Sequence, residues 1–333
     1  MIRPKLIKIL VAVALLVLIC LLPLIVRNAY WIHVFILVAI MILATSCVRA
    51  INRTGEISLG TAGFMLLGGY SSALLSLKLG LSPWLTMPLG GLFAAAVAAA
   101  VGYPFFRVKG VYFAITTLLV GFIFLYLAGY LSDLTGGWQG LQFYSLSPDP
   151  ITLGTLTITF TTKTNIEYYY LAIIVIGLCL FVLFRLEHSR IGMVWKSIRE
   201  ADNLAQSVGV NIMAQKIFIF VIACFFTGLA GALYAFHVHA LSPTSTPANI
   251  FHFFTSIYCL LYMVVGGEGS FFGPIIGTTL FMFMFEFSRP LQMYRPLVYG
   301  GVLILIVFFM PRGLIAAGEY FPGWYRKLVG HSK

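Results

Sequence analysis

The sequence is poor in charged residues. Only 9% of its 333 residues are Asp, Glu, Lys or Arg, against roughly 25% in an average soluble domain, and this scarcity excludes a soluble globular protein. It also excludes a disordered chain, which needs a polar excess. Apolar residues are abundant instead: 60% are hydrophobic, 15% are aromatic, and the mean hydropathy is +0.99. We therefore expect an all-α polytopic membrane protein with a single transmembrane domain over residues 1–333.

Motifs for binding nucleotides or metals are also lacking. No Gly is followed directly by Lys, which excludes a P-loop, so any use of ATP requires another subunit. The five cysteines lie inside apolar runs without a Cys-x-x-Cys spacing, which predicts neither a zinc site nor a disulfide framework. The net charge of +11 comes from small basic groups between apolar runs. Because nucleic-acid binding needs one basic face, no nucleic acid is expected as a partner.

Few titratable residues fall inside the apolar runs. His237, His239 and His252 invite a metal interpretation, but no acid or Cys completes a ligand set, so neither a metal nor another cofactor is expected. Glu286 is the one acid well inside an apolar run, and an acid there is a functional candidate by default. Arg289 stands one turn away, which favours a structural ion pair.

Apolar runs interrupted by Gly, Pro or charge predict about ten transmembrane helices. Residues 1–8 form a basic flank like that of a signal peptide, but the apolar stretch that follows is too long and lacks a small-x-small cleavage site, so we expect a retained first helix. The predicted spans lie near residues 6–26, 30–48, 57–78, 83–104, 111–131, 167–186, 216–236, 251–266, 273–288 and 296–311.

Connections rich in basic residues alternate with connections poor in them along the chain. Short cytoplasmic loops carry the Lys and Arg excess, and sixteen of the 21 basic residues fall on one side if both termini are cytoplasmic. These are Arg3, Lys5, Lys8, Arg49, Arg53, Arg107, Lys109, Arg185, Arg190, Lys196, Arg199, Lys216, Arg312, Arg326, Lys327 and Lys333. The outer side then holds Arg27, Lys78, Lys163, Arg289 and Arg295. We therefore expect both termini in the cytoplasm.

Three predicted spans are rich in small residues, which let helix backbones approach closely or allow a helix to break beside a cavity. We expect these Gly-rich or broken helices in the interior of the bundle. The residues are Gly60, Gly63, Gly68 and Gly69 in the third span, Gly90, Gly91 and 94–100 in the fourth, and Gly273, Pro274 and Gly277 in the ninth.

Two long connections are expected outside the membrane. The extracytoplasmic loop 132–166 contains a Ser-Pro-Asp-Pro turn followed by alternating Thr and apolar residues, which predicts a short β-hairpin. The cytoplasmic loop 185–216 contains an amphipathic helix, with Gly209 as its C-terminal cap. Its apolar positions are Val194, Ile198, Ala201, Ala205 and Val208. So short a helix must rest on the bundle or in a groove of another protein.

An ordered set of motifs over about residues 45–315 resembles the LivM-type permeases of branched-chain amino acid (HAAT family) ABC importers. The matching segments are Gly55-Glu-Ile-Ser-Leu-Gly60 with Gly63-Phe64 and Gly68-Gly69-Tyr70; Tyr103 to Thr117; Leu134-Thr-Gly-Gly-Trp-Gln-Gly-Leu141; Arg190 to Glu200 with Gly209-Val-Asn211; and Gly266-Gly-Glu-Gly-Ser270 with Gly273-Pro274.

This resemblance implies a multi-pass permease subunit, without enzymatic activity of its own, in the bilayer of a prokaryotic inner membrane. The implied partners are a homologous second permease, two cytoplasmic ATP-binding subunits and an extracytoplasmic solute-binding protein. It also implies a coupling helix that begins Glu-Ala-Ala and is followed by Gly; here the third position is Asp202. The expected coupling residues are Arg199, Glu200, Ala201, Ala205 and Gly209.

The solute path is predicted from polar residues on Gly-rich or family-like spans. These are Ser58, Thr61, Tyr70, Tyr112, Thr116 and Thr117. The resemblance implies branched-chain amino acids as solute, while other amino acids, urea or short amides stay open. Two alternatives outside the family are an ion-coupled secondary transporter and a membrane-embedded enzyme. Both need convergent titratable groups, which the sequence does not provide.

Overall fold

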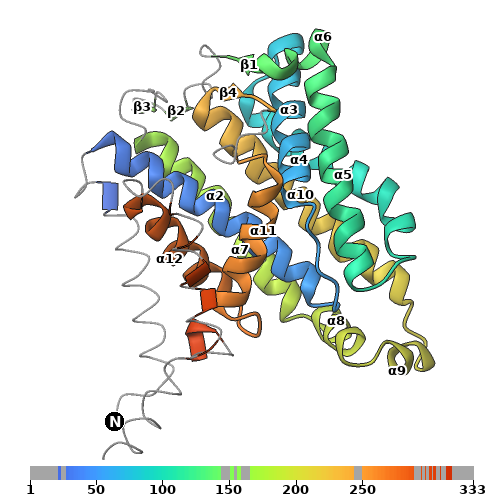
Figure 1. Cartoon of the computed structure of the whole chain (residues 1–333). Helices are drawn as coiled ribbons and strands as arrows, with labels where there is room; N and C mark the ends of the chain where they lie inside the picture. The colour runs from blue at the N-terminus through green and yellow to red at the C-terminus, as the bar shows by residue number, and fades with distance from the viewer. Residues whose placement is uncertain are drawn as a thin grey trace, which may run out of the picture.

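The structure is a computed structural model that describes residues 22–23, 28–143, 151–153, 156–158, 166–243 and 250–288, together with single residues and short pieces between 294 and 316. The described part is a bundle of helices (Figure 1). Six helices are long and apolar enough to cross a membrane: α2 (Ala29–Asn52), α3 (Thr61–Leu79), α4 (Pro83–Phe105), α5 (Val111–Tyr130), α7 (Ile166–Glu187) and α10 (Ile212–Val238). Two shorter apolar helices follow, α11 (Phe253–Gly266) and α12 (Gly273–Phe287).

Each of these eight helices corresponds to a predicted span, which confirms an all-α polytopic architecture. The other two predicted spans, near residues 6–26 and 296–311, fall mostly outside the described residues, as do the two chain ends. The third span begins at Thr61 rather than at residue 57. Residues 56–60 are not helical, and the backbone N–H of Leu59 donates instead to the Thr117 hydroxyl at 3.0 Å.

Small residues bring α3 and α4 into close contact with α10, and the sequence predicted such packing for the first two of these helices. A Cβ atom on Gly68 or Gly231 would overlap the backbone of the facing helix, at Gly228 and Met65 respectively. The small residues left two outcomes open, close approach of backbones or a broken helix, and α3 and α4 show close approach. Both run without interruption, and α4 continues across the internal Pro88, because packing against α10 supports the helices where their own propensity is low.

The two ends of the bundle differ in their connections (Figure 1). One end carries α6 (Ser132–Thr135), the 3-10 turn η1 (Gly137–Gln139), and strand β1 (Leu141–Gln142) paired antiparallel with β4 (Ala240–Leu241). Strands β2 (Ile151–Leu153) and β3 (Leu156–Ile158) pair antiparallel within the loop where a hairpin was predicted. The opposite end carries α8 (Arg190–Glu200) and α9 (Asp202–Ser207). A short 3-10 turn, η3 (Leu314–Ala316), packs near α11 and α12.

A cluster of aromatic rings forms the core near the α8–α9 end. Phe64, Phe105, Phe106 and Phe113 all pack around Phe220, with ring centroids 5.5 to 6.2 Å from it. These rings come from α3, α4, α5, α10 and the α4–α5 connection. Because such rings pack densely and each buries a large apolar area, the cluster fixes the positions from which the polar side chains at this end extend.

Candidate functional site

The loop predicted to hold one amphipathic helix contains two. The helix that was expected across Val194 to Val208 is interrupted at Ala201, whose backbone is extended at φ −158° and ψ 91°. A continuous helix would place Asp202 one turn after Ile198, on the apolar face. The interruption instead puts the Asp202 carboxylate in the first turn of α9, where the helix dipole favours negative charge.

The apolar edge of this α8–α9 unit, which comprises the two helices and their cap over residues 190–209, rests on the bundle. Trp195, Ile198 and Ala205 are buried, and the Trp195 indole N–H donates to the Gln215 side chain of α10 at 3.2 Å. The sequence left open whether this segment rests on the bundle of its own chain or in a groove of another protein, and in the structure it rests on its own bundle. Ala205, predicted as a coupling contact, therefore faces inward.

Other apolar side chains of the unit point to the surface. Leu204 is 70% exposed, Val208 is 78% exposed, and Met193 on α8 is also exposed. Gly209 ends α9 as predicted: at φ +85° it lets Val210 N–H donate to Ala205 O and its own N–H donate to Gln206 O, at 3.1 and 3.0 Å. The unit thus presents two neighbouring apolar side chains from a firmly capped turn.

The predicted coupling residues Arg199, Glu200 and Ala201 differ in their surroundings. Glu200 lies on the exposed face, where its only ion pair among the described residues is with Lys196 at 3.7 Å. Ala201 forms the interruption itself. Arg199 turns toward the bundle, where its guanidinium pairs with Glu268 at 2.7 Å. Of these three, Arg199 alone links α8 to the membrane helices through its side chain in the described structure.

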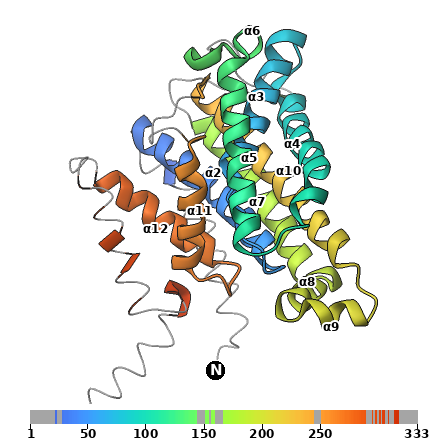
Figure 2. The ribbon, with the colours of Figure 1, turned by 45° about the vertical axis from the view of Figure 1, so that its right-hand side comes forward.

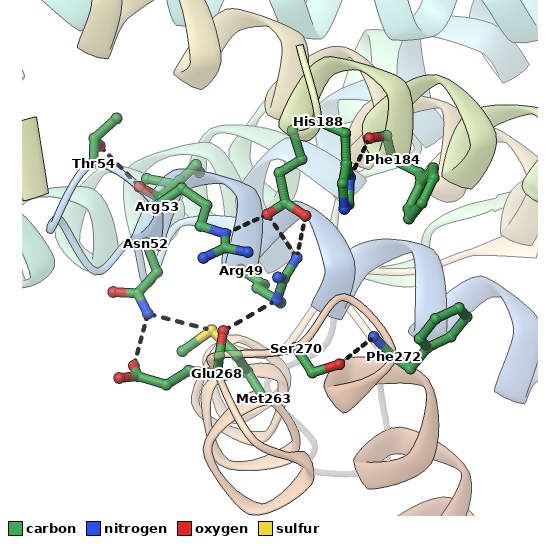
Figure 3. A network of polar contacts seen from close by, with 12 residues as sticks. Arg49, Asn52, Arg53, Thr54, Phe184, His188, Met263, Glu268, Ser270 and Phe272 are labelled. Carbon is green, nitrogen blue, oxygen red and sulfur yellow. Dashed lines mark hydrogen bonds and ion pairs between the residues drawn. The ribbon is translucent and has the colours of Figure 1, made fainter. Parts of the chain in front are cut away.

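Charged residues from α2, α7 and the α11–α12 connection converge at the end of α2 (Figure 3). Arg49 donates from Nη1 to both carboxylate oxygens of Glu187, the last residue of α7, at 2.7 and 2.9 Å. Arg53 donates to the same carboxylate from Nε. Both Arg49 and Glu187 are nearly inaccessible, with side chains 2% and 6% exposed. Charge-assisted bonds of this kind are roughly twice as strong as neutral ones, so they hold the ends of α2 and α7 together.

Glu268 receives the second group of bonds at this end (Figure 3). It lies in the connection between α11 and α12, and its carboxylate accepts from Arg199 at 2.7 Å and from Asn52 at 2.9 Å. Its backbone oxygen accepts from Arg49 Nε at 3.2 Å. Burial raises the pKa of this carboxyl, but the bonds from Asn52 and Arg199 outweigh burial, and the pKa of Glu268 lies below its usual value.

A third group of bonds surrounds Asp202. Its carboxylate pairs with Lys109, in the connection between α4 and α5, at 3.2 Å and with Lys216 on α10 at 3.5 Å. Lys216 is buried and pairs more closely with Glu56, at 2.9 Å. Glu56 also accepts from the backbone N–H of Gly110 at 3.1 Å. These bonds join α9 to the starts of α5 and α10.

Sequence reasoning did not single out Glu56, Glu187 or Glu268. All three lie at the ends of predicted spans on the side of the membrane that holds most basic residues, although the connection that contains Glu268 has no Lys or Arg of its own. The sequence could therefore have indicated that these acids lie on the same side of the membrane as most basic residues. It could not have identified the partner of each acid, because that depends on the packing of helices far apart in the sequence.

The six predicted path residues do not share one surface. Ser58, Thr61, Tyr70 and Thr117 are buried inside the bundle, whereas Tyr112 is 73% exposed and Thr116 is half-buried beside it on α5. The cavity near Thr61, lined by Ala62, Gly63 and Ser256 among others, has a volume of about 10 Å³, roughly the size of one water molecule. It is far too small for an amino acid.

The exposed face of α5 carries a larger groove. This groove, of about 570 Å³, is lined by Leu119, Phe122, Ile123, Tyr126, Leu127 and Tyr130. Two rows at seven-residue spacing follow this face: Tyr112, Leu119 and Tyr126, and Thr116, Ile123 and Tyr130. Such spacing keeps side chains on one side of a helix and is typical of a seam with a second helix. α5 is also the least buried of the six long helices, as its outer position in Figure 2 shows.

The histidines singled out in the sequence are placed at the β1–β4 end. His237 Nε2 lies 2.7 Å from Nδ1 of His33 on α2, and the His237 ring stacks on Tyr168. His239 is separate and has a left-handed backbone at φ 58°, while His252 caps α11 by accepting from Phe254 N–H. Among the described residues, no three His, Cys, Asp or Glu side chains converge to hold a metal. Arg289, the predicted partner of Glu286, lies outside the described residues.

Comparison with known proteins matches most of the chain to transport permeases. The family described as "Branched-chain amino acid transport system / permease component" matches residues 29–309. The high-affinity branched-chain amino acid transport permease LivM of Escherichia coli is 32% identical over 283 residues, which cover 80% of this chain and 65% of that protein. This chain therefore spans slightly less than two thirds of the length of that relative.

More distant relatives include transporters with other named solutes. A probable branched-chain amino acid permease of Methanocaldococcus jannaschii is 22% identical, over 69% of this chain and 67% of that protein. The guanosine ABC transporter permease NupQ of Bacillus subtilis is 27% identical, over 55% of this chain and 60% of that protein. No solved structure matches.

Proposed function

The chain belongs to the family of branched-chain amino acid transport permease components, and on that premise we propose that it is a membrane permease subunit of a prokaryotic ABC importer. The observation that carries this proposal is the family match over residues 29–309, together with 32% identity to LivM. As the solute we propose branched-chain amino acids, because the LivM match covers more of the chain, at higher identity, than the match to the guanosine permease.

ATP hydrolysis in this proposal is the work of two cytoplasmic partner subunits, because the chain has no P-loop. We place their docking surface on the α8–α9 unit. Its exposed Leu204 and Val208 stand beside charged residues, a combination that suits an apolar groove with a polar rim. This revises the expected role of Ala205, which is buried and so packs the unit against the bundle instead of contacting an ATPase.

The solute path, we propose, runs along the outer face of α5 and is closed by a homologous second permease. The interior beside Thr61 and Thr117 is too tightly packed for a solute, whereas the α5 groove has room for one. Its apolar lining with scattered Tyr hydroxyls suits a small solute with an aliphatic side chain. Tyr112 and Thr116 keep their predicted role, while Ser58, Thr61, Tyr70 and Thr117 serve as internal hydrogen-bonding and packing residues.

The test is ATP-dependent uptake of labelled leucine into proteoliposomes that contain the full complex of two permeases and two ATPases, with the binding protein supplied outside. We expect Leu119→Trp, which fills the groove, to reduce uptake at least about tenfold. Ile174→Trp adds the same ring to an exposed position on α7 and should transport normally. Equal uptake by the two variants would refute the α5 path, and concentrative uptake by this chain alone would refute the permease assignment.

A further inference from the structure

The α8–α9 unit is fastened to the bundle by two separate sets of ion pairs on either side of its interruption. Arg199, the last residue but one of α8, reaches Glu268 in the α11–α12 connection at 2.7 Å. Asp202 reaches Lys109 before α5 at 3.2 Å and Lys216 on α10 at 3.5 Å. Because Ala201 is extended, consecutive positions along the chain point to different parts of the protein.

The first fastening ends on a rigid support. The α11–α12 connection is closed by glycines that leave no room for a side chain: a Cβ on Gly266 would overlap Gly273, and one on Gly313 would overlap Gly267, whose backbone φ is +108°. Glu268 projects from this loop and is held a second time, by Asn52 at the end of α2. A displacement of Arg199 therefore acts on α2, α11 and α12 together.

The second fastening ends on a different support. Lys216 and Glu56 form a buried pair, with side chains 6% and 5% exposed, and Glu56 also accepts from the N–H of Gly110 just before α5. In a poorly solvated site, leaving either charge without its partner is strongly unfavourable. A displacement of Asp202 therefore acts on α10 and on α5, the helix that carries the groove.

We propose that Arg199 and Asp202 are positioning residues that carry movement of the α8–α9 unit into two distinct parts of the bundle. Arg199 acts through Glu268 on α2, α11 and α12, and Asp202 acts through Lys109 and Lys216 on α5 and α10. This inference rests on the proposed function, in which ATPase subunits move the unit. A structural unit that moves between two positions affects its surroundings only through contacts that differ between those positions.

Charge reversal tests the first fastening. In the reconstituted complex, Arg199→Glu and Glu268→Arg should each lower solute uptake per ATP hydrolysed at least about fivefold, with ATP hydrolysis itself retained. Combining the two restores the ion pair in reverse and should restore the ratio to within about threefold. Lys78→Glu, a charge reversal at an exposed position at the end of α3 and outside the α8–α9 unit, should leave the ratio unchanged. A double variant as uncoupled as its parents would overturn the assignment.

Neutral variants test whether the two fastenings are separate, and they avoid the repulsion that a reversed charge adds. Arg199→Gln and Asp202→Asn should each lower uptake per ATP, and their effects should multiply in the double variant, because the two side chains share no ion-pair partner and independent sites are additive in free energy. Arg199→Gln combined with Glu268→Gln should be no worse than either one, since both remove the same pair. Two results would refute the assignment of two separate fastenings. One is that Arg199→Gln with Asp202→Asn is no worse than either alone while Arg199→Gln with Glu268→Gln is worse, and the other is that coupling is unchanged in every variant.

The failure of this inference is distinguishable from that of the proposed function. If the wild-type complex imports no solute with ATP, the permease assignment itself has failed. If wild type imports solute and the Arg199 and Asp202 variants retain its uptake per ATP, the proposed function stands and the two-branch inference is wrong. Variants that do not assemble are replaced by Arg199→Lys, which keeps the charge and should retain most of the coupling.

Discussion

Gly231 of α10 is the sharpest test of how the bundle is held together. Its Cα faces the Met65 carbonyl of α3, and a Cβ atom there would overlap that backbone rather than a side chain able to rotate away. Gly231→Ala must therefore push α3 and α10 apart by about 1 Å, which forfeits a quarter to a half of the attraction between the atoms that line the gap. Overpacking of a well-packed core costs about 1–3 kcal/mol, and a clash with fixed backbone belongs at the upper end.

The gain in helix propensity from Gly to Ala, about 1 kcal/mol, offsets part of this cost. The net loss of about 2 kcal/mol corresponds to a fall in apparent Tm of roughly 4–8 °C, at about 2–4 °C per kcal/mol. The assay is thermal unfolding of the purified protein in detergent. Gly177→Ala is the matched control, because Gly177 on α7 is exposed and a Cβ there meets nothing within 4 Å. A Gly231→Ala protein that melts at or above the wild-type temperature would refute the packing argument.

Two further outcomes follow from the α8–α9 end. Leu204→Asp should reduce ATPase binding to the permease in a pull-down at least about tenfold, since it charges an exposed docking side chain, whereas Leu79→Asp, exposed at the far end of α3, should bind normally. The pKa of Glu268 is lowered, so its bond to Arg199 contributes stability that is present above its unfolded pKa and lost as pH falls through the folded value. Uptake per ATP should accordingly be constant from pH 8 to about pH 5. Glu268→Gln should change the value of uptake per ATP but not its dependence on pH in this range. A steep change in wild type between pH 6 and 8 that disappears in Glu268→Gln would contradict this.

Much of the fold could be predicted from the sequence because membrane helices satisfy their own backbone bonds locally. Apolar length located α2, α4, α5, α7 and α10 to within a few residues. Small residues located the packed faces, since close approach of backbones requires them whichever helix is the partner. The sequence left open whether the small residues of α3 and α4 mark close packing or a break, because a Gly or Pro is as compatible with close packing as with a kink.

The candidate site was less accessible to sequence reasoning. Helical periodicity grouped Ala205 with Val208 on one apolar edge, but the interruption at Ala201 rotates α9, so that Ala205 is buried while Val208 is exposed. The interruption places Asp202 within ion-pair distance of Lys109 and Lys216, which are 93 and 14 residues away. No local pattern contains that information. Glu268 shows the same limit, because its partners Asn52 and Arg199 belong to elements distant in sequence.

The packing of α3 against α10 also explains why a solute path within this one chain is disfavoured. The two backbones meet without intervening side chains at Gly68 and Gly231, so opening a passage between them would remove the densest contacts of the bundle. The α5 face has no such contacts to lose, because its groove is already open. In the proposed arrangement a second permease packs there and can separate from α5 and return, and Asp202 pairs with Lys109 in the connection that leads into that helix. Movement of the α8–α9 unit thus acts where opening costs least, which is the physical reason to place the path at the boundary between subunits.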